Sequence, residues 1–182
     1  PLIALMKDQV ESLKQKGIPS LAIYSGMSFL EIKKTLQSAA YGNYKFLYVS
    51  PERLETNLFL EFLPAMNINL LAVDEAHCIS QWGYDFRPPY MRIAALRELL
   101  PAVPVLALTA SATKIVQTDI CEKLKPADSQ VPPSGGGGGS WKIFQQSFER
   151  LNLSYSVFNV PSKQNKLLEI LKNVPGTAIV YC

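Results

Sequence analysis

Short apolar runs alternate along the chain with longer stretches whose apolar residues recur at helical spacing. In the first of these stretches, apolar residues at positions 5, 6, 10 and 13 predict a helix that ends before Gly17. Four apolar runs predict strands, and the segments that separate or follow them predict further helices. The expected strands are 21–24, 46–49, 70–73 and 105–108, and the expected helices are 5–16, 29–41, 51–64, 90–100 and 113–124.

This order of elements is typical of an α/β fold, in which a parallel sheet carries helices on both faces. The run 70–73 is apolar throughout, as expected of a strand that is buried on both faces. In such sheets, ligands bind beyond the carboxyl ends of the strands. Three polar or small-residue segments follow predicted strands and therefore become candidates for a site: 50–53, 74–77 and 109–113.

The composition changes near residue 126, which predicts a boundary between two domains. Pro/Gly-rich residues 126–142 form a predicted linker, and its five consecutive glycines favour an engineered joint over a natural glycine-rich loop. We expect a first domain at 1–125 and the beginning of a second, truncated domain at 143–182. In the second domain, the pattern predicts strands at 153–158 and 177–181 and a helix at 163–172.

Overall composition narrows the function only slightly. Hydrophobic residues make up 48% of the chain and charged residues 18%, which indicates a real core rather than disorder. A net charge of +3 permits a nucleic-acid partner without requiring one. The three cysteines include no CxxC pair, so we expect no zinc site, and their odd number fits a reducing, intracellular compartment. No apolar run approaches the ~18 residues of a membrane span, so no membrane partner is expected.

The strongest chemical signal is Asp74-Glu75-Ala76-His77, directly after an apolar run. Asp74 could hold Mg²⁺ through water, because hard cations prefer carboxylate oxygens. Glu75 could then orient and polarise an attacking water, with His77 hydrogen-bonded to a neighbouring loop. The alternative is an acidic surface loop without chemistry. A metal site made of Glu75, His77 and Cys78 is disfavoured, because residues so close in sequence converge only in a special loop and His77 is the only histidine.

An unusually aromatic segment follows these residues. Trp82, Tyr84, Phe86 and Tyr90 lie close to Arg87 in a stretch that also contains Gly and two Pro. Aromatic faces can stack on nucleic-acid bases, each for ~1–3 kcal/mol, and Arg can add a cation–π contact. The alternative is that these rings only pack the loop onto the core.

The string Asp74–Gly83, together with Asp85–Pro88 and Tyr90, resembles motif II and the aromatic-rich loop of the RecQ family of superfamily 2 DNA helicases. Few other families join these two features, and the general DEAH-box RNA helicases share only the first four residues. Other segments resemble RecQ blocks in the same order, so that the resemblance covers nearly the whole chain outside 126–142. They are 1–10 (motif Ia), 48–54, 108–113 (motif III), 147–153 (the opening of the second motor domain) and 178–182 (motif IV).

The resemblance implies two RecA-like domains with ATP and Mg²⁺ between them, and 3′-to-5′ unwinding of single-stranded or partially duplex DNA in repair and recombination. It implies a location in the bacterial cytoplasm or nucleoid, or in a eukaryotic nucleus. It also implies catalytic roles for Asp74, Glu75 and His77. Ser111 and Thr113 would link His77 to motif III, and the DNA-sensing residues would be Trp82, Tyr84, Phe86 and Arg87.

The sequence departs from the RecQ pattern in three respects. Tyr84 stands where the family has His, and a phenol does not titrate near neutral pH. Ser111 replaces Thr but keeps the hydroxyl. No GxxxxGK[ST] phosphate-binding loop occurs in these 182 residues. We therefore expect this chain to be an inactive piece of a helicase motor, and the alternative is a non-hydrolysing module that binds single-stranded DNA or a partner.

Overall fold

The chain forms two compact units, Pro1–Trp141 and Lys142–Cys182, each of which is considered by itself. The computed structural model describes residues 2–83, 85–125, 141–146 and 152–181. The glycine run and most of the predicted linker therefore lie outside the described residues. So does most of the block at 147–153 that resembles the opening of a second motor domain.

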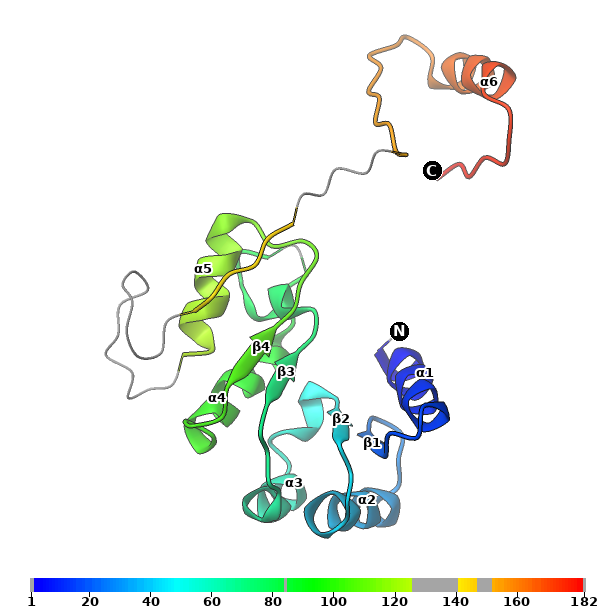
Figure 1. The fold of residues 1–182 in the computed structure, drawn as a ribbon. Coiled ribbons are helices and arrows are strands. Elements are labelled where there is room, and N and C mark those ends of the chain that lie inside the picture. Colours follow the sequence, from blue (N-terminus) through cyan, green and yellow to red (C-terminus); the bar gives the residue numbers. More distant parts are fainter. Residues whose placement is uncertain (1, 84, 126–140, 147–151, 182) are drawn as a thin grey trace. The chain divides into compact units, whose positions relative to one another are not determined.

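The first unit alternates helices and short strands, as the sequence predicts (Figure 1). Its helix α2 matches the expected range, because Ser28 and Glu31 form a capping box at its start and Gly42 caps its end. The expected helix 51–64 is instead divided into a 3₁₀ turn, a six-residue helix and a second 3₁₀ turn. The bounds are α1 Leu2–Gln15, β1 Ser20–Ile23, α2 Phe29–Tyr41, β2 Phe46–Val49, α3 Asn57–Phe62, β3 Leu71–Val73, α4 Met91–Leu99, β4 Val105–Ala107 and α5 Lys114–Lys123.

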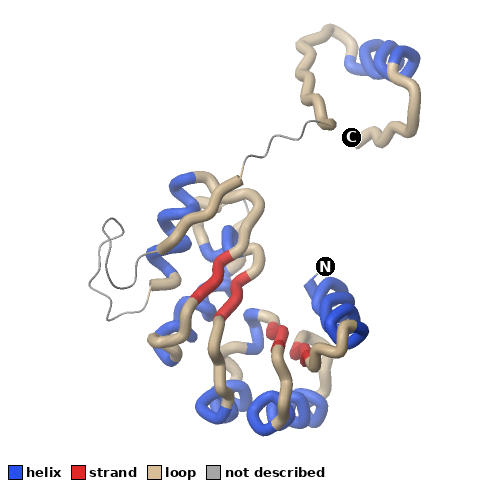
Figure 2. The backbone as a smooth tube through the Cα atoms, viewed as in Figure 1, coloured by secondary structure: helices blue, strands red, loops and turns tan. Residues whose placement is uncertain are grey.

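The strands that the structure describes all pair in parallel, which confirms the predicted α/β class, but they form two pairs rather than one sheet (Figure 2). Strand β1 pairs with β2 in the register Ser20↔Phe46, and β3 pairs with β4 in the register Leu71↔Val105. Among the described residues, no ladder of hydrogen bonds joins β2 to β3. The chain between these two strands instead passes through α3 and the flanking 3₁₀ turns.

The β3–β4 pair buries one face only, which differs from the expected burial on both faces. Val73 is 3% exposed and belongs to the main core. On the alternate positions, Leu106 is 45% exposed, and Leu108 just beyond the strand is 47% exposed. Successive strand residues point to opposite faces, so the described residues cover one side of this pair and leave the other open.

The second unit contains a single described helix, α6 Lys163–Asn173, close to the predicted range. The strands expected at 153–158 and 177–181 do not form in the described residues. Val157 is 99% exposed and Tyr181 is fully exposed. An apolar run becomes a strand only when its backbone finds a paired neighbour, and neither segment has one here. No helix among the described residues is long and apolar enough to cross a membrane.

The buried Arg97 holds together the carboxyl ends of two helices in the first unit. Its side chain is 4% exposed, and its guanidinium donates to the backbone oxygens of Leu124 (3.2 Å) and Val103 (2.7 Å). It also donates to the carbonyl of Leu100 at the end of α4. Helix ends leave carbonyl groups without partners, and Arg97 satisfies several of them at once.

We predict that Arg97→Met lowers the free energy of unfolding by about 2–4 kcal/mol, because it leaves several backbone acceptors in the core without a donor. The control is Arg92→Met on the same helix, which removes a partly exposed ion pair with Glu55 at 2.6 Å. Such a pair contributes less than about 1 kcal/mol. Urea denaturation of the chain measures both changes, and equal losses in the two variants would contradict the structural role given to Arg97.

Candidate functional site

The polar residues after β3 form a tight turn at the carboxyl end of the strand. Asp74 is exposed, and its Oδ1 accepts a hydrogen bond from the backbone N–H of Glu75 at 2.9 Å. Glu75 has a positive φ of 50°, which is uncommon for a residue with a side chain. A 3₁₀ turn, Ala76–Ile79, follows at once. Backbone strain of this kind clusters at functional sites, so the turn is a candidate site on geometry alone.

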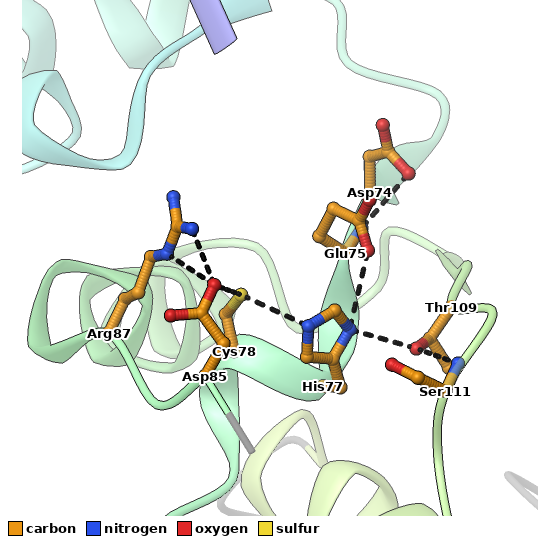
Figure 3. Close-up of polar contacts among 8 residues, drawn as sticks. All are labelled: Asp74, Glu75, His77, Cys78, Asp85, Arg87, Thr109 and Ser111. Carbon is orange, nitrogen blue, oxygen red and sulfur yellow. Dashed lines mark hydrogen bonds and ion pairs between the residues drawn. The ribbon is translucent and has the colours of Figure 1, made fainter. Parts of the chain in front are cut away.

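His77 connects this turn to the loop after β4 (Figure 3). Its Nδ1 lies 3.0 Å from Oγ1 of Thr109 and 3.3 Å from Oε2 of Glu75. The His77 side chain is only 13% exposed, whereas that of Glu75 is 53% exposed. A neutral imidazole protonated on Nδ1 donates to this pair of oxygens and leaves the lone pair of Nε2 for another partner.

The structure pairs His77 with Thr109 rather than with the two motif III hydroxyls expected from the resemblance. Ser111 is exposed, and its backbone N–H donates to Oγ1 of Thr109 at 3.3 Å. Thr113 caps helix α5 by accepting from the backbone N–H of Val116 at 3.5 Å. Thr109 lies in the candidate segment 109–113 but was not predicted as the residue that contacts His77. Ser111 is hydrogen-bonded to it, and Thr113 caps the next helix.

The parallel register of β3 and β4 explains why Thr109 lies beside His77. Val73 lies opposite Ala107, so Glu75 and Thr109 are each two residues beyond a matched pair. The N–H of Ala76 donates to the carbonyl of Leu108 at 2.9 Å and extends this match past the strands. Neighbouring parallel strands therefore bring residue 109 beside the 74–77 turn.

The aromatic loop, which carries Trp82, Phe86 and Arg87, folds back onto the same turn. An added Cβ at Gly83 would lie 2.6 Å from the carbonyl oxygen of His77, so only glycine permits this approach. The N–H of Arg87 donates to the carbonyl of Cys78 at 3.0 Å, which anchors the far end of the loop. Any displacement of this loop must therefore act on the backbone of the 76–79 turn.

The predicted DNA-sensing residues differ in their exposure and in their contacts. Trp82 is 75% exposed, as a stacking platform should be, and Phe86 is half-buried. Tyr84 lies outside the described residues. Arg87 forms an ion pair with Asp85, donating from Nε to Oδ2 at 3.0 Å. Hydrogen bonding from Arg87 lowers the pKa of Asp85, and the same contact raises the pKa of Arg87.

Two buried ionisable groups lie beneath the loop. Burial raises the pKa of the Cys78 thiol, which is 1% exposed. Burial likewise raises the pKa of Tyr90 to about 12. Both groups therefore stay protonated and neutral at neutral pH.

Comparison with known proteins identifies the class to which this arrangement belongs. Residues 1–119 match the family model described as DEAD/DEAH box helicase. This match covers more than half of the chain and includes the β3 turn, the aromatic loop and the segment after β4. The chain therefore belongs to the DEAD/DEAH box helicase family.

Curated relatives narrow the class further. The whole chain is 40% identical to the ATP-dependent DNA helicase RecQ of Bacillus subtilis, of which it spans 29%. It is 38% identical to the ATP-dependent DNA helicase Q-like 4B of Arabidopsis thaliana, spanning 16% of that protein. It is 34% identical to the mouse bifunctional 3′-5′ exonuclease/ATP-dependent helicase WRN, spanning 13%. The predicted RecQ-like identity is confirmed, and the chain spans less than a third of these relatives' lengths.

Proposed function

We propose that this chain is part of the motor of an ATP-dependent DNA helicase that unwinds DNA in the 3′-to-5′ direction during repair and recombination. The observation that carries the proposal is the turn at the end of β3. There, Asp74 and Glu75 face solvent while His77 reaches Thr109 after the neighbouring strand. One turn thus joins the two acidic residues to a second loop and, through Gly83, to the aromatic loop.

Each polar residue of the turn has a distinct proposed role. Asp74 presents an exposed carboxylate at a strand end, a hard oxygen donor suited to Mg²⁺ through its water shell. When bound together with ATP, Mg²⁺ would neutralise negative charge on the phosphates. Glu75 orients and polarises the attacking water. His77 contacts the Glu75 carboxylate at 3.3 Å and the Thr109 hydroxyl at 3.0 Å, and its proposed role is to couple the position of Glu75 to the loop after β4.

Two further expectations stand as proposals. Residues 1–125 form the first RecA-like domain, 126–142 the linker and 143–182 the beginning of the second domain. Single-stranded or partially duplex DNA contacts the aromatic loop, with Trp82 as the exposed stacking surface. Phe86 and Arg87 support that contact, as does Tyr84. A location with cellular DNA, in a nucleoid or nucleus, follows from this proposal.

The proposed catalysis is tested with a full-length protein that contains this chain. We predict that Glu75→Gln lowers DNA-stimulated ATP hydrolysis by about 10²-fold or more, because the amide cannot take up a proton from the attacking water. Glu61→Gln, an exposed carboxyl on α3, is the matched control and should leave the rate unchanged. The isolated 182-residue chain should show no hydrolysis, since its sequence contains no GxxxxGK[ST] loop.

Full activity in Glu75→Gln would contradict the proposed role of Glu75. Absence of hydrolysis in the unmodified full-length protein, with DNA binding intact, would support the alternative of a non-hydrolysing DNA-binding module.

The DNA contact is tested by fluorescence anisotropy with labelled single-stranded DNA. We predict that Trp82→Ala raises the Kd by about 5- to 100-fold, the equivalent of losing one stacked base. Tyr41→Ala removes another exposed aromatic ring, at the end of α2, and should leave the Kd unchanged. Equal affinities for both variants across a salt titration would show that the aromatic loop is structural.

A further inference from the structure

Three different ligand types meet beneath the aromatic loop. The Nε2 of His77 lies 3.7 Å from Sγ of Cys78, which in turn lies 4.0 Å from Oδ2 of Asp85. All three atoms lie within 4.8 Å of one another (Figure 3). His77 and Cys78 come from the 3₁₀ turn, and Asp85 comes from the loop that folds back over it. This return brings in a third ligand that spacing around His77 alone does not suggest.

The separations suit one small cation held by all three atoms. A tetrahedral zinc ion binds sulfur at about 2.3 Å and nitrogen or oxygen at about 2.0–2.2 Å, so its ligand atoms lie about 3.4–3.6 Å apart. The distances from Cys78 Sγ to the other two atoms exceed this by only a few tenths of an ångström. The distance between Nε2 of His77 and Oδ2 of Asp85, which lies within 4.8 Å, also has to shorten, so Asp85 has to turn toward His77 for the site to close.

The surroundings of His77 prepare it as a ligand. Its Nδ1 faces Oε2 of Glu75 at 3.3 Å and Oγ1 of Thr109 at 3.0 Å. Metal-binding histidines commonly donate their other ring N–H to a carboxylate, which fixes the ring and makes the ligating nitrogen more basic. The same arrangement directs Nε2 of His77 toward the Cys78 sulfur.

We propose that His77, Cys78 and Asp85 form a binding site for a thiophilic divalent cation of the zinc class, with water as the fourth ligand. Binding releases the Cys78 thiol proton to solvent and forms bonds to Sγ, Nε2 and Oδ2. Arg87 already donates to that oxygen of Asp85, so the cation competes with the ion pair. An occupied site fixes Nε2 of His77 and draws Asp85 away from Arg87. The cation therefore acts on the turn and the loop to which the proposed function assigns hydrolysis and DNA contact.

The test uses Co²⁺ as an optical probe of the purified chain. A cysteine-bound, four-coordinate Co²⁺ gives thiolate-to-metal absorption in the near ultraviolet and intense bands in the visible. We predict both for the unmodified chain, with loss of both on addition of excess Zn²⁺. Cys78→Ser should abolish the near-ultraviolet band, whereas Cys121→Ser and Cys182→Ser should retain it.

Absence of thiolate absorption in the unmodified chain, or its persistence in Cys78→Ser, would overturn the proposal. A second variant guards against a misfolded Cys78→Ser. Asp85→Asn alters a partly exposed carboxyl, and we predict at least tenfold weaker Co²⁺ binding with an unchanged far-ultraviolet circular dichroism spectrum. Unchanged Co²⁺ affinity in Asp85→Asn would show that Asp85 is not a ligand and would overturn the proposed three-ligand site.

Discussion

The parallel pairing of β3 with β4 places Val73 opposite Ala107, and the geometry of the candidate site depends on this register. The N–H of Leu108 donates to the carbonyl of Val73 at 2.8 Å, and the N–H of Ala76 donates to the carbonyl of Leu108 at 2.9 Å. These bonds hold the 74–77 turn beside Thr109. A slip of one residue would turn the side chains of β3 to the opposite face and separate His77 from its partner.

A second constraint ties the aromatic loop to the same turn. Gly83 approaches the His77 carbonyl too closely for any side chain, and the backbone N–H of Arg87 donates a hydrogen bond to the carbonyl of Cys78. The 76–79 turn thus follows the acidic residues directly and contacts both the loop after β4 and the aromatic loop. The proposed coupling between nucleotide chemistry and DNA would act through such an element, one whose conformation both sites can bias. The proposed cation site uses the same turn, because its ligands are two of these residues and one from the loop.

The sequence predicted those parts of the fold that depend on local signals. The helix 29–41 has a capping box and a closing glycine, and the structure has it at the same residues. The polar turn after β3 was also found, because an apolar run followed by charged residues is visible in the sequence. The RecQ-like identity came from the string 74–90, which joins two family features in one segment.

The sequence predicted that His77 contacts a neighbouring loop, but not which residues of distant segments meet. Thr109 was missed because its contact with His77 follows from the β3–β4 register and not from either segment alone. Asp85 was missed as a neighbour of Cys78 because only the folded-back loop brings them together. The expected strands at 153–158 and 177–181 have apolar patterns, but a strand also needs a partner, which composition cannot supply.

The His77–Thr109 contact links the acidic turn to the loop after β4. A double-mutant cycle with His77→Ala and Thr109→Val tests it most directly, read out as the stimulation of ATP hydrolysis by single-stranded DNA in a full-length protein. We expect the double variant to lose no more stimulation than His77→Ala alone, because both changes remove one shared contact. Losses that multiply independently would contradict the account and show that the two residues act separately.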